Sequence, residues 1–198
     1  MPIELENLTY TYMPGTPFEA RAVDDLSLKI EDGEFLGIIG HTGSGKTTMI
    51  GLIAGLLKPT SGRVLIDGED IAAKGYDRKK LRRKIGVVFQ YPEHQLFEET
   101  VYKDIAFGPG KLGISEAETE ERVRYAMELM ELDFDSVKNL SPFELSGGQK
   151  RRVAIAGVLA MKPSVLILDE PVAGLDPAGR IHLMNMIRRL NREGVTIL

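Results

Sequence analysis

The chain has 198 residues, of which 43% are hydrophobic and 27% charged, with a formal net charge of −4 and no cysteine. This composition supports one globular domain with its own core. The negative charge argues against broad nucleic-acid binding, and the lack of cysteine excludes disulfides and thiolate metal sites and suits a reducing compartment. The longest apolar stretch, 153–161, is shorter than the about 20 residues of a membrane span, and no signal peptide is visible.

The N-terminal region is predicted to form an antiparallel edge sheet. Alternating apolar residues indicate half-buried strands over 3–12 and 23–30, with turns at 13–15 and 32–33. A further strand is expected at 64–66. Such alternation predicts a sheet with one face on the core and one face toward solvent.

The most specific motif lies at 40–47 and fits the phosphate-binding pattern G-x-x-x-x-G-K-[ST]. We expect a buried strand at 35–39 before it and a helix after it, so that backbone N–H groups face the phosphates of a nucleoside triphosphate. Lys46 is expected to reach the β- and γ-phosphates, and the Thr47 hydroxyl to bind Mg²⁺. The nucleotide-binding residues predicted here are Gly40, His41, Thr42, Gly43, Ser44, Gly45, Lys46, Thr47 and Thr48.

A basic run at 78–84 leads into a buried strand predicted at 85–89, which ends just before Gln90. No aromatic residue interleaves with the basic run, so a solvated helix face is favoured over a nucleic-acid site. The Gln90 amide offers both a donor and an acceptor and can contact Mg²⁺ and an attacking water together. The alternative for Gln90 is a strand-end glutamine without a catalytic role.

From residue 91 to about 161 the pattern becomes helical and predicts a helical lobe inserted into the core. Ser115 with Glu118 forms a capping-box pattern at the start of one helix. Core packing explains its apolar stripe better than a cofactor does. The stripe at helical spacing consists of Val123, Ala126, Met127 and Met130.

A second phosphate-binding surface is predicted at 145–149, with the sequence Leu-Ser-Gly-Gly-Gln. Ser146 and Gln149 form a capping box that places a helix start at Ser146. The Ser146 hydroxyl and the N–H groups of Gly147 and Gly148 then lie at the positive end of a helix. Because one triphosphate has little need of two such surfaces, we expect a head-to-tail dimer in which Ser146 faces the γ-phosphate bound by the other subunit. An ordinary capped helix is the alternative.

Two carboxylates follow the apolar run 165–168, which predicts a buried parallel strand. Open α/β sheets bind ligands at this carboxyl edge. We assign Asp169 to the Mg²⁺ site and Glu170 to the general base that activates water. The alternative for Glu170 is a strand-end carboxylate that caps the turn at Pro171.

In this order the motifs resemble those of the ATP-binding cassette (ABC) ATPases, from about residue 3 to the end of the chain. The resemblance implies a Q-loop at Gln90, a D-loop whose Asp176 lies at the dimer interface, and an aromatic side chain, Tyr12, stacked on adenine. It implies an α/β fold: a P-loop nucleoside triphosphatase core with a mostly parallel sheet, an N-terminal antiparallel β subdomain and an inserted helical subdomain. The single domain, 1–198, would then comprise a nucleotide-binding core at 1–90 and 162–198 and a helical, signature-bearing subdomain at 91–161. The implied site residues are Lys46, Gln90 and Glu170 for catalysis, Thr47, Gln90 and Asp169 for the metal, and Ser146, Gly147, Gly148 and Gln149 for the partner's ATP.

A narrower resemblance is to the ATPases of energy-coupling factor (ECF) importers, which take up vitamins and transition-metal ions in prokaryotes. It rests on short stretches at 15–19, 33–35, 40–43 and 91–97. It implies ATP and Mg²⁺ as cofactors and a second ATPase subunit, identical or paralogous. It also implies a transmembrane coupling subunit, a substrate-binding membrane subunit, no nucleic-acid partner, and a place on the cytoplasmic face of the cell membrane.

The chain departs from the family pattern at Leu198, before the position of the family's switch histidine. We therefore expect the C-terminal part of the fold to be missing and this form to bind ATP but turn it over poorly. Two other functions stay open: a soluble ABC ATPase of DNA repair or translation, and a catalytically degenerate regulatory nucleotide-binding subunit. The absence of a coiled-coil insert and of cysteine metal sites argues against the first. The intact Lys46, Asp169 and Glu170 argue against the second.

Overall fold

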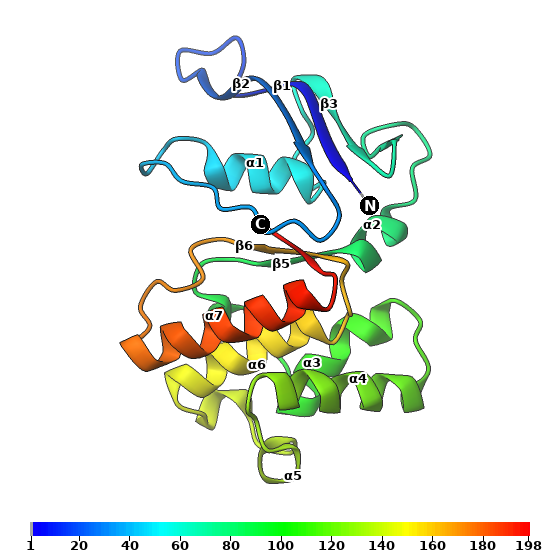
Figure 1. Ribbon diagram of the computed structural model, residues 1–198, viewed down its shortest axis with the longest axis vertical. Helices are drawn as coiled ribbons and strands as arrows, with labels where there is room; N and C mark the ends of the chain where they lie inside the picture. The colour runs from blue at the N-terminus through cyan, green and yellow to red at the C-terminus, as the bar shows by residue number, and fades with distance from the viewer. Residues whose placement is uncertain (1) are drawn as a thin grey trace.

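The computed structural model describes residues 2–198, which form two sheets with helices between and below them (Figure 1). Within this range the antiparallel sheet has the order β2-β1-β3-β4 and the parallel sheet the order β5-β6-β7. The antiparallel strands are β1 (Ile3–Tyr12), β2 (Ala20–Ile30), β3 (Ser61–Ile66) and β4 (Glu69–Asp70). The parallel strands are β5 (Ile85–Val88), β6 (Val165–Leu168) and β7 (Thr196–Ile197).

The antiparallel sheet predicted at the N-terminus is confirmed. β1 pairs with β2 through Ile3 and Ile30, and with β3 through Ile3 and Ile66. These three side chains are buried. Side chains alternate between the two faces of a strand, which brings Ile3 and Leu5 to one core, and a register shift between Leu5 and Leu8 brings Leu8 to the same core. That core also contains the helix α1 (Lys46–Ile53).

Strand β6 lies in the middle of the parallel sheet, and all of its residues are buried. Val165 and Ile167 pack in the hydrophobic cluster of α1 and the antiparallel sheet. Leu166 and Leu168 pack in a second cluster, formed mainly by the helices on the opposite face. A strand that is apolar on both faces is what a parallel sheet covered on both sides requires.

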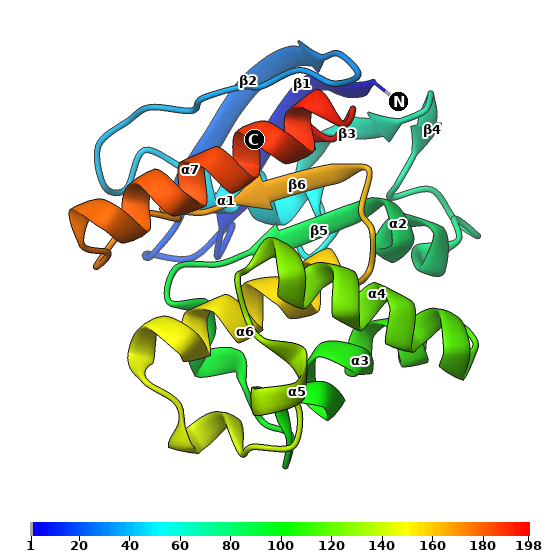
Figure 2. The same cartoon turned by 60° about the horizontal axis from the view of Figure 1, so that its bottom comes forward.

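The helices after β5 gather below the parallel sheet, as Figure 2 shows for α3, α4, α5 and α6. The apolar stripe predicted for α4 is buried, and Ser115 is its N-cap, accepting a hydrogen bond from the Glu118 backbone N–H. The helical character predicted from 91 to 161 is thereby confirmed. The helices are α2 (Arg78–Lys84), α3 (Val101–Lys111), α4 (Glu116–Leu129), α5 (Phe134–Val137), α6 (Gly147–Leu159) and α7 (Pro177–Arg192), with 3-10 turns η1 (Pro92–Gln95) and η2 (Pro142–Glu144).

The buried strand predicted at 35–39 is wrong. Phe35 makes a single parallel bridge to Ile197, and the segment that follows is not a strand. The side chain of Ile39 is 99% exposed. The physical reason is that the backbone bonds of this segment stop at Leu36: Ile197 is linked to Glu34 and Leu36, and within residues 2–198 no backbone group bonds to that of 37–39.

The basic run at 78–84 forms α2, whose buried residue is Leu81. Two of its lysines form ion pairs with carboxylates near β4: Lys80 with Glu69, and Lys84 with Asp67. The prediction of a largely solvated helix face is confirmed. Within residues 2–198, no helix has both the length and the apolar character to cross a membrane.

Candidate active site

The phosphate-loop motif leads directly into α1, with Gly45 at the N-cap position. Gly45 has a φ of 89°, and a Cβ built on it would lie 2.2 Å from the carbonyl oxygen of Ala22. A Cβ on Gly40 would lie 2.5 Å from the Ser44 Oγ. The backbone of the loop therefore requires glycine at position 45, whereas a side chain at position 40 would displace the Ser44 hydroxyl. As predicted, the N-terminus of α1 lies directly after the loop. A helix N-terminus favours the binding of anions.

Lys46 lies over the loop that precedes it. Its Nζ donates to the carbonyl oxygens of Gly40 at 2.7 Å and His41 at 3.1 Å. The loop itself is closed by a hydrogen bond from the Ser44 backbone N–H to the His41 carbonyl, at 3.1 Å. Lys46 also lines a cavity of about 250 Å³ that is bounded by Asp169 and Glu170. Lys46 and the two carboxylate residues therefore line one cavity.

Thr47 and Asp169 are in direct contact. The Thr47 hydroxyl donates to the Asp169 Oδ2 at 2.9 Å, and Asp169 is only 8% exposed. The backbone N–H of Asp169 donates to the Val88 carbonyl, which fixes the carboxylate at the edge of β5 and β6. Residues 2–198 contain no group of three or more His, Cys, Asp or Glu side chains that could hold a metal. One hydroxyl and one carboxylate suit Mg²⁺, which keeps several water and phosphate oxygens as ligands.

Gln90 and Glu170 meet across the ends of β5 and β6. The Gln90 Nε2 donates to the Glu170 Oε2 at 3.0 Å. Glu170 has a φ of 48°, and its carbonyl accepts a 3.0 Å hydrogen bond from the Ala173 N–H. This turn points the chain away from the sheet directly after the carboxylate. Both side chains are therefore placed where they can contact the same water.

Tyr12 lies beside the start of α1. Its hydroxyl is 3.1 Å from the Thr48 Oγ1, and its ring packs edge-to-face on Tyr10 with centroids 4.8 Å apart. The side chain is 42% exposed. An exposed aromatic face next to the phosphate loop is available for stacking on a base.

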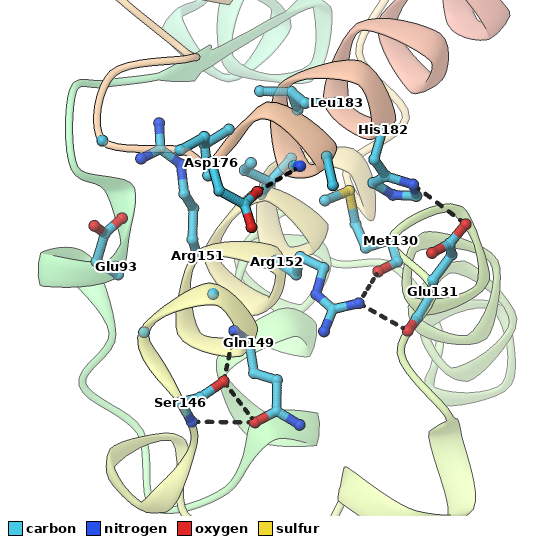
Figure 3. A pocket seen from close by; sticks show the side chains of 17 residues that line it. Glu93, Met130, Glu131, Ser146, Gln149, Arg151, Arg152, Asp176, His182 and Leu183 are labelled. Atoms are coloured by element: carbon cyan, nitrogen blue, oxygen red, sulfur yellow. Dashed lines mark hydrogen bonds and ion pairs between the residues drawn. The ribbon is translucent and has the colours of Figure 1, made fainter.

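The capping box predicted at the start of α6 is confirmed. The Ser146 Oγ accepts from the Gln149 N–H at 3.3 Å, and the Gln149 Oε1 accepts from the Ser146 N–H at 3.1 Å. A Cβ built on Gly147 or Gly148 would meet nothing within 4 Å. The N-terminal end of α6 is therefore not covered by other parts of the described chain. It faces a cavity of about 680 Å³, drawn in Figure 3, which Asp176 also lines.

The phosphate loop and the α6 N-terminus do not meet within one subunit. They line separate cavities with no lining residue in common. In Figure 1, α1 lies above the parallel sheet and α6 below it. Asp176 is the N-cap of α7 and accepts from the Gly179 N–H at 2.7 Å. It also lines the cavity in front of α6.

Arg151 is a site residue that the sequence reasoning missed. It is 5% exposed, and its guanidinium donates to the carbonyl oxygens of Pro171 and Ala173. The available signal is its helical spacing: Arg151, Ile155 and Leu159 form one buried stripe of α6. A charged residue in an otherwise apolar stripe needs polar partners in the interior.

A phosphate loop at the start of α1, with two carboxylates at the adjacent end of a parallel strand, defines a P-loop nucleoside triphosphatase domain. Residues 23–173 match the model of the family described as ABC transporter. The chain belongs to this family, which confirms the ATPase class and the fold predicted from the sequence.

Curated relatives narrow the comparison to ECF ATPases. The energy-coupling factor transporter ATP-binding protein EcfA2 of Clostridium acetobutylicum is 62% identical over 193 residues, which cover 98% of this chain and 68% of that protein. The EcfA2 of Clostridium perfringens is 58% identical over 199 residues, covering 100% of this chain and 70% of that protein.

Solved structures agree with the fold. The structure of cbiO1 from Clostridium perfringens, part of the ABC transporter complex cbiONQ, is 42% identical with a TM-score of 0.84, covering 98% of this chain and 76% of that one. The ATP-binding cassette MJ0796, solved as a dimer bound to ADP and Pi, is 34% identical with a TM-score of 0.86, covering 98% of this chain and 85% of that one.

Proposed function

We propose that this chain is the ATP-binding and ATP-hydrolysing subunit of an ECF-type membrane importer for vitamins or transition-metal ions. The observation that carries the ATPase function is the pair of contacts Thr47–Asp169 and Gln90–Glu170 at one edge of the parallel sheet. The importer function is supported by the identity of 62% to a protein named as an ECF ATP-binding subunit.

In the proposed chemistry, Lys46 and the loop N–H groups bind the β- and γ-phosphates of ATP. Thr47, Asp169 and Gln90 would hold Mg²⁺, which would neutralise phosphate charge. Glu170 accepts a proton from the attacking water, and Gln90 orients that water. Lys46 must exchange its bonds to two loop carbonyls for bonds to phosphate, which are charge-assisted and stronger.

The catalytic unit is a head-to-tail dimer. Ser146 and the N–H groups at the front of α6 complete the nucleotide site of the partner, and Asp176 lies at the same interface. The separation of the two phosphate-binding surfaces within one subunit supports this arrangement. So does the dimer formed by the structural neighbour MJ0796 with ADP and Pi.

The proposed assembly contains a second ATPase subunit, identical or paralogous, a transmembrane coupling subunit and a small substrate-binding membrane subunit. The ATPase lies on the cytoplasmic face of the membrane. The relation to cbiO1, which is part of a transporter complex, supports this assembly. Rigid-body closure of the ATPase pair would then drive the membrane partner.

Within the chain, we assign the nucleotide-binding core to 1–90 and 162–198, and the helical signature subdomain to 91–161. The packing of α3, α4 and α6 in one hydrophobic cluster supports the second unit. This cluster also contains one face of β6 and the inner face of α7. A movement of the helical unit would therefore displace the carboxyl end of β6, which packs in the same cluster.

The test of the transport function is co-purification in detergent. The chain, carrying an affinity tag and expressed with the membrane subunits encoded beside it, is expected to bring those subunits along. The complex in liposomes should take up solute only with Mg–ATP. A Lys46→Ala chain should purify with the same subunits but support no uptake. Recovery of the chain without membrane subunits, or with DNA or ribosomes, would contradict the importer function.

A further inference from the structure

Arg151 lines the cavity in front of α6, and its guanidinium binds two backbone carbonyl groups in the segment after Glu170. Its Nη1 donates to the Ala173 carbonyl at 2.8 Å, and its Nη2 donates to the Pro171 carbonyl at 2.5 Å. In Figure 3 the side chain extends from α6 toward the segment that precedes Asp176. The flat fork of the guanidinium suits two acceptors at a fixed separation, and a lysine ammonium cannot reproduce it.

This contact is not explained by stability. Arg151 is 5% exposed, both Nη atoms bond to neutral carbonyls, and its Nε has no hydrogen-bond partner in the described chain. Burying a charge without a carboxylate is costly, and an apolar residue of similar volume is often equal or better for the fold. A buried cation at this position is more consistent with control of local geometry.

The segment that Arg151 holds begins directly after Glu170. The Ala173 N–H donates to the Glu170 carbonyl at 3.0 Å, closing a turn in which Glu170 has a φ of 48°. A non-glycine residue persists in this left-handed conformation when its surroundings fix it. Arg151 fixes the two carbonyl groups of that turn, at Pro171 and Ala173. It therefore holds the backbone that directly follows Glu170.

The backbone of Arg151 belongs to α6. The N-terminus of this helix is the surface proposed to bind the partner's nucleotide. Arg151 lies five residues after Ser146 in the sequence, about 7.5 Å along a helix that rises 1.5 Å per residue. A helix moves as a rigid element, so a shift at Ser146 also shifts the guanidinium. The same guanidinium holds the turn after Glu170.

We propose that Arg151 is a positioning residue that couples the two nucleotide sites of the dimer. Closure of Ser146 on the partner's γ-phosphate moves α6, and Arg151 transmits this movement to Glu170 and to Asp176 beyond it. Each subunit thereby aligns its own general base when its signature helix engages the other subunit's ATP. This inference rests on the proposed roles of Ser146 and Glu170.

The experiment uses the ATPase–membrane complex with Arg151→Lys and Arg151→Met. Because a misplacement of about 1 Å can cost about 100-fold in rate, we expect kcat for ATP to fall at least about tenfold. The MgATP concentration at half-saturation should stay within about threefold. In the Glu170→Gln background, Arg151→Lys should cause no further loss of the residual rate, since a residue that acts through Glu170 is not additive with it.

The matched control is Arg122→Met. Arg122 also donates to a carbonyl, that of Met161, but it lies on α4 away from the turn after Glu170. It should leave kcat and the half-saturating MgATP concentration within about twofold, both in the parental chain and in the Glu170→Gln background.

Three results would overturn the inference. The first is an unchanged kcat in both Arg151 variants. The second is a loss that adds to that of Glu170→Gln. The third is an Arg151→Lys protein that fails to fold while Arg122→Met folds, which would assign Arg151 to the fold. Failure of the proposed function is separate, because Glu170→Gln alone would then keep the parental rate.

Discussion

Gln90 and Glu170 stand 80 positions apart in the sequence and are joined by a 3.0 Å hydrogen bond from the Gln90 amide to the Glu170 carboxylate. The bond exists because β5 and β6 are parallel neighbours, with Val88 opposite Leu168. Each side chain follows its strand by two residues and reaches the same edge. The bond leaves the second carboxylate oxygen of Glu170 free of this amide, so it can accept a proton while Gln90 fixes the side chain.

The first prediction concerns Glu170→Gln in a full-length version of the chain that includes the family's switch histidine. Removing a general base costs about 10²–10⁴ in rate, so kcat for ATP should fall by at least about 100-fold. ATP binding is kept, because the loop at 40–47 is untouched, and the ATP-loaded dimer should accumulate. Steady-state ATPase assays and size-exclusion chromatography with Mg–ATP measure the two effects. Glu69→Gln, which removes a surface ion pair with Lys80, is the control and should retain the parental rate. Parental turnover by Glu170→Gln would show that Glu170 is not the base.

The second prediction concerns Lys46→Ala. Its ammonium is the cation that the loop places at the phosphates, so tight ATP binding should be lost, with Kd raised at least about tenfold for one charge-assisted contact. Titration calorimetry with ATP measures this directly. Lys79→Ala removes the same charge from the surface helix α2 and should leave ATP affinity within about twofold. Equal affinities in the two variants would contradict the assignment of the phosphate loop.

The sequence predicts best those features whose causes are local. The Ser146–Gln149 capping box involves residues three apart, and it forms as expected. The burial of 165–168 follows from an apolar run of strand length between turn signals. The phosphate loop needs glycine for its own backbone and so carries its signal within eight residues.

The features that the sequence does not predict depend on distant neighbours. The 35–39 segment is as apolar as a buried strand, but its pairing depends on Ile197, at a distant point of the sequence. The role of Arg151 depends on carbonyls at 171 and 173, to which no spacing rule points.

The third prediction uses the pH dependence of a helix cap. Asp133 is the N-cap of α5, and hydrogen bonds from Ser136, first from its side chain and then from its backbone, hold the Asp133 pKa below its ordinary value of 3.8. A depressed pKa adds stability that is present above the unfolded-state value and is lost as pH falls through the folded-state value. Asp133→Asn keeps an acceptor but cannot titrate. The Tm advantage of the parental chain should therefore be present at pH 6 and shrink below about pH 4. A constant Tm difference from pH 6 to pH 3 would contradict this cause.

The last prediction separates two costs at the phosphate loop. Gly45 and Gly75 have nearly the same left-handed backbone, with φ values of 89° and 90°. A Cβ on Gly75 would meet nothing within 4 Å, whereas one on Gly45 would lie 2.2 Å from the Ala22 carbonyl oxygen. Gly75→Ala should thus lose about 1–2 kcal/mol, the cost of the backbone conformation alone.

Gly45→Ala carries the same conformational cost and adds a clash with backbone that belongs to β2. The strand and the N-terminus of α1 must move apart, so its free energy of unfolding should fall further, by at least about 1 kcal/mol. ATP affinity should also fall, because the displaced N–H groups no longer converge on one point. Denaturant titrations and calorimetry with ATP measure both quantities. If the two alanine variants lose the same stability and both bind ATP normally, the close approach of Gly45 to Ala22 has no role in shaping the loop.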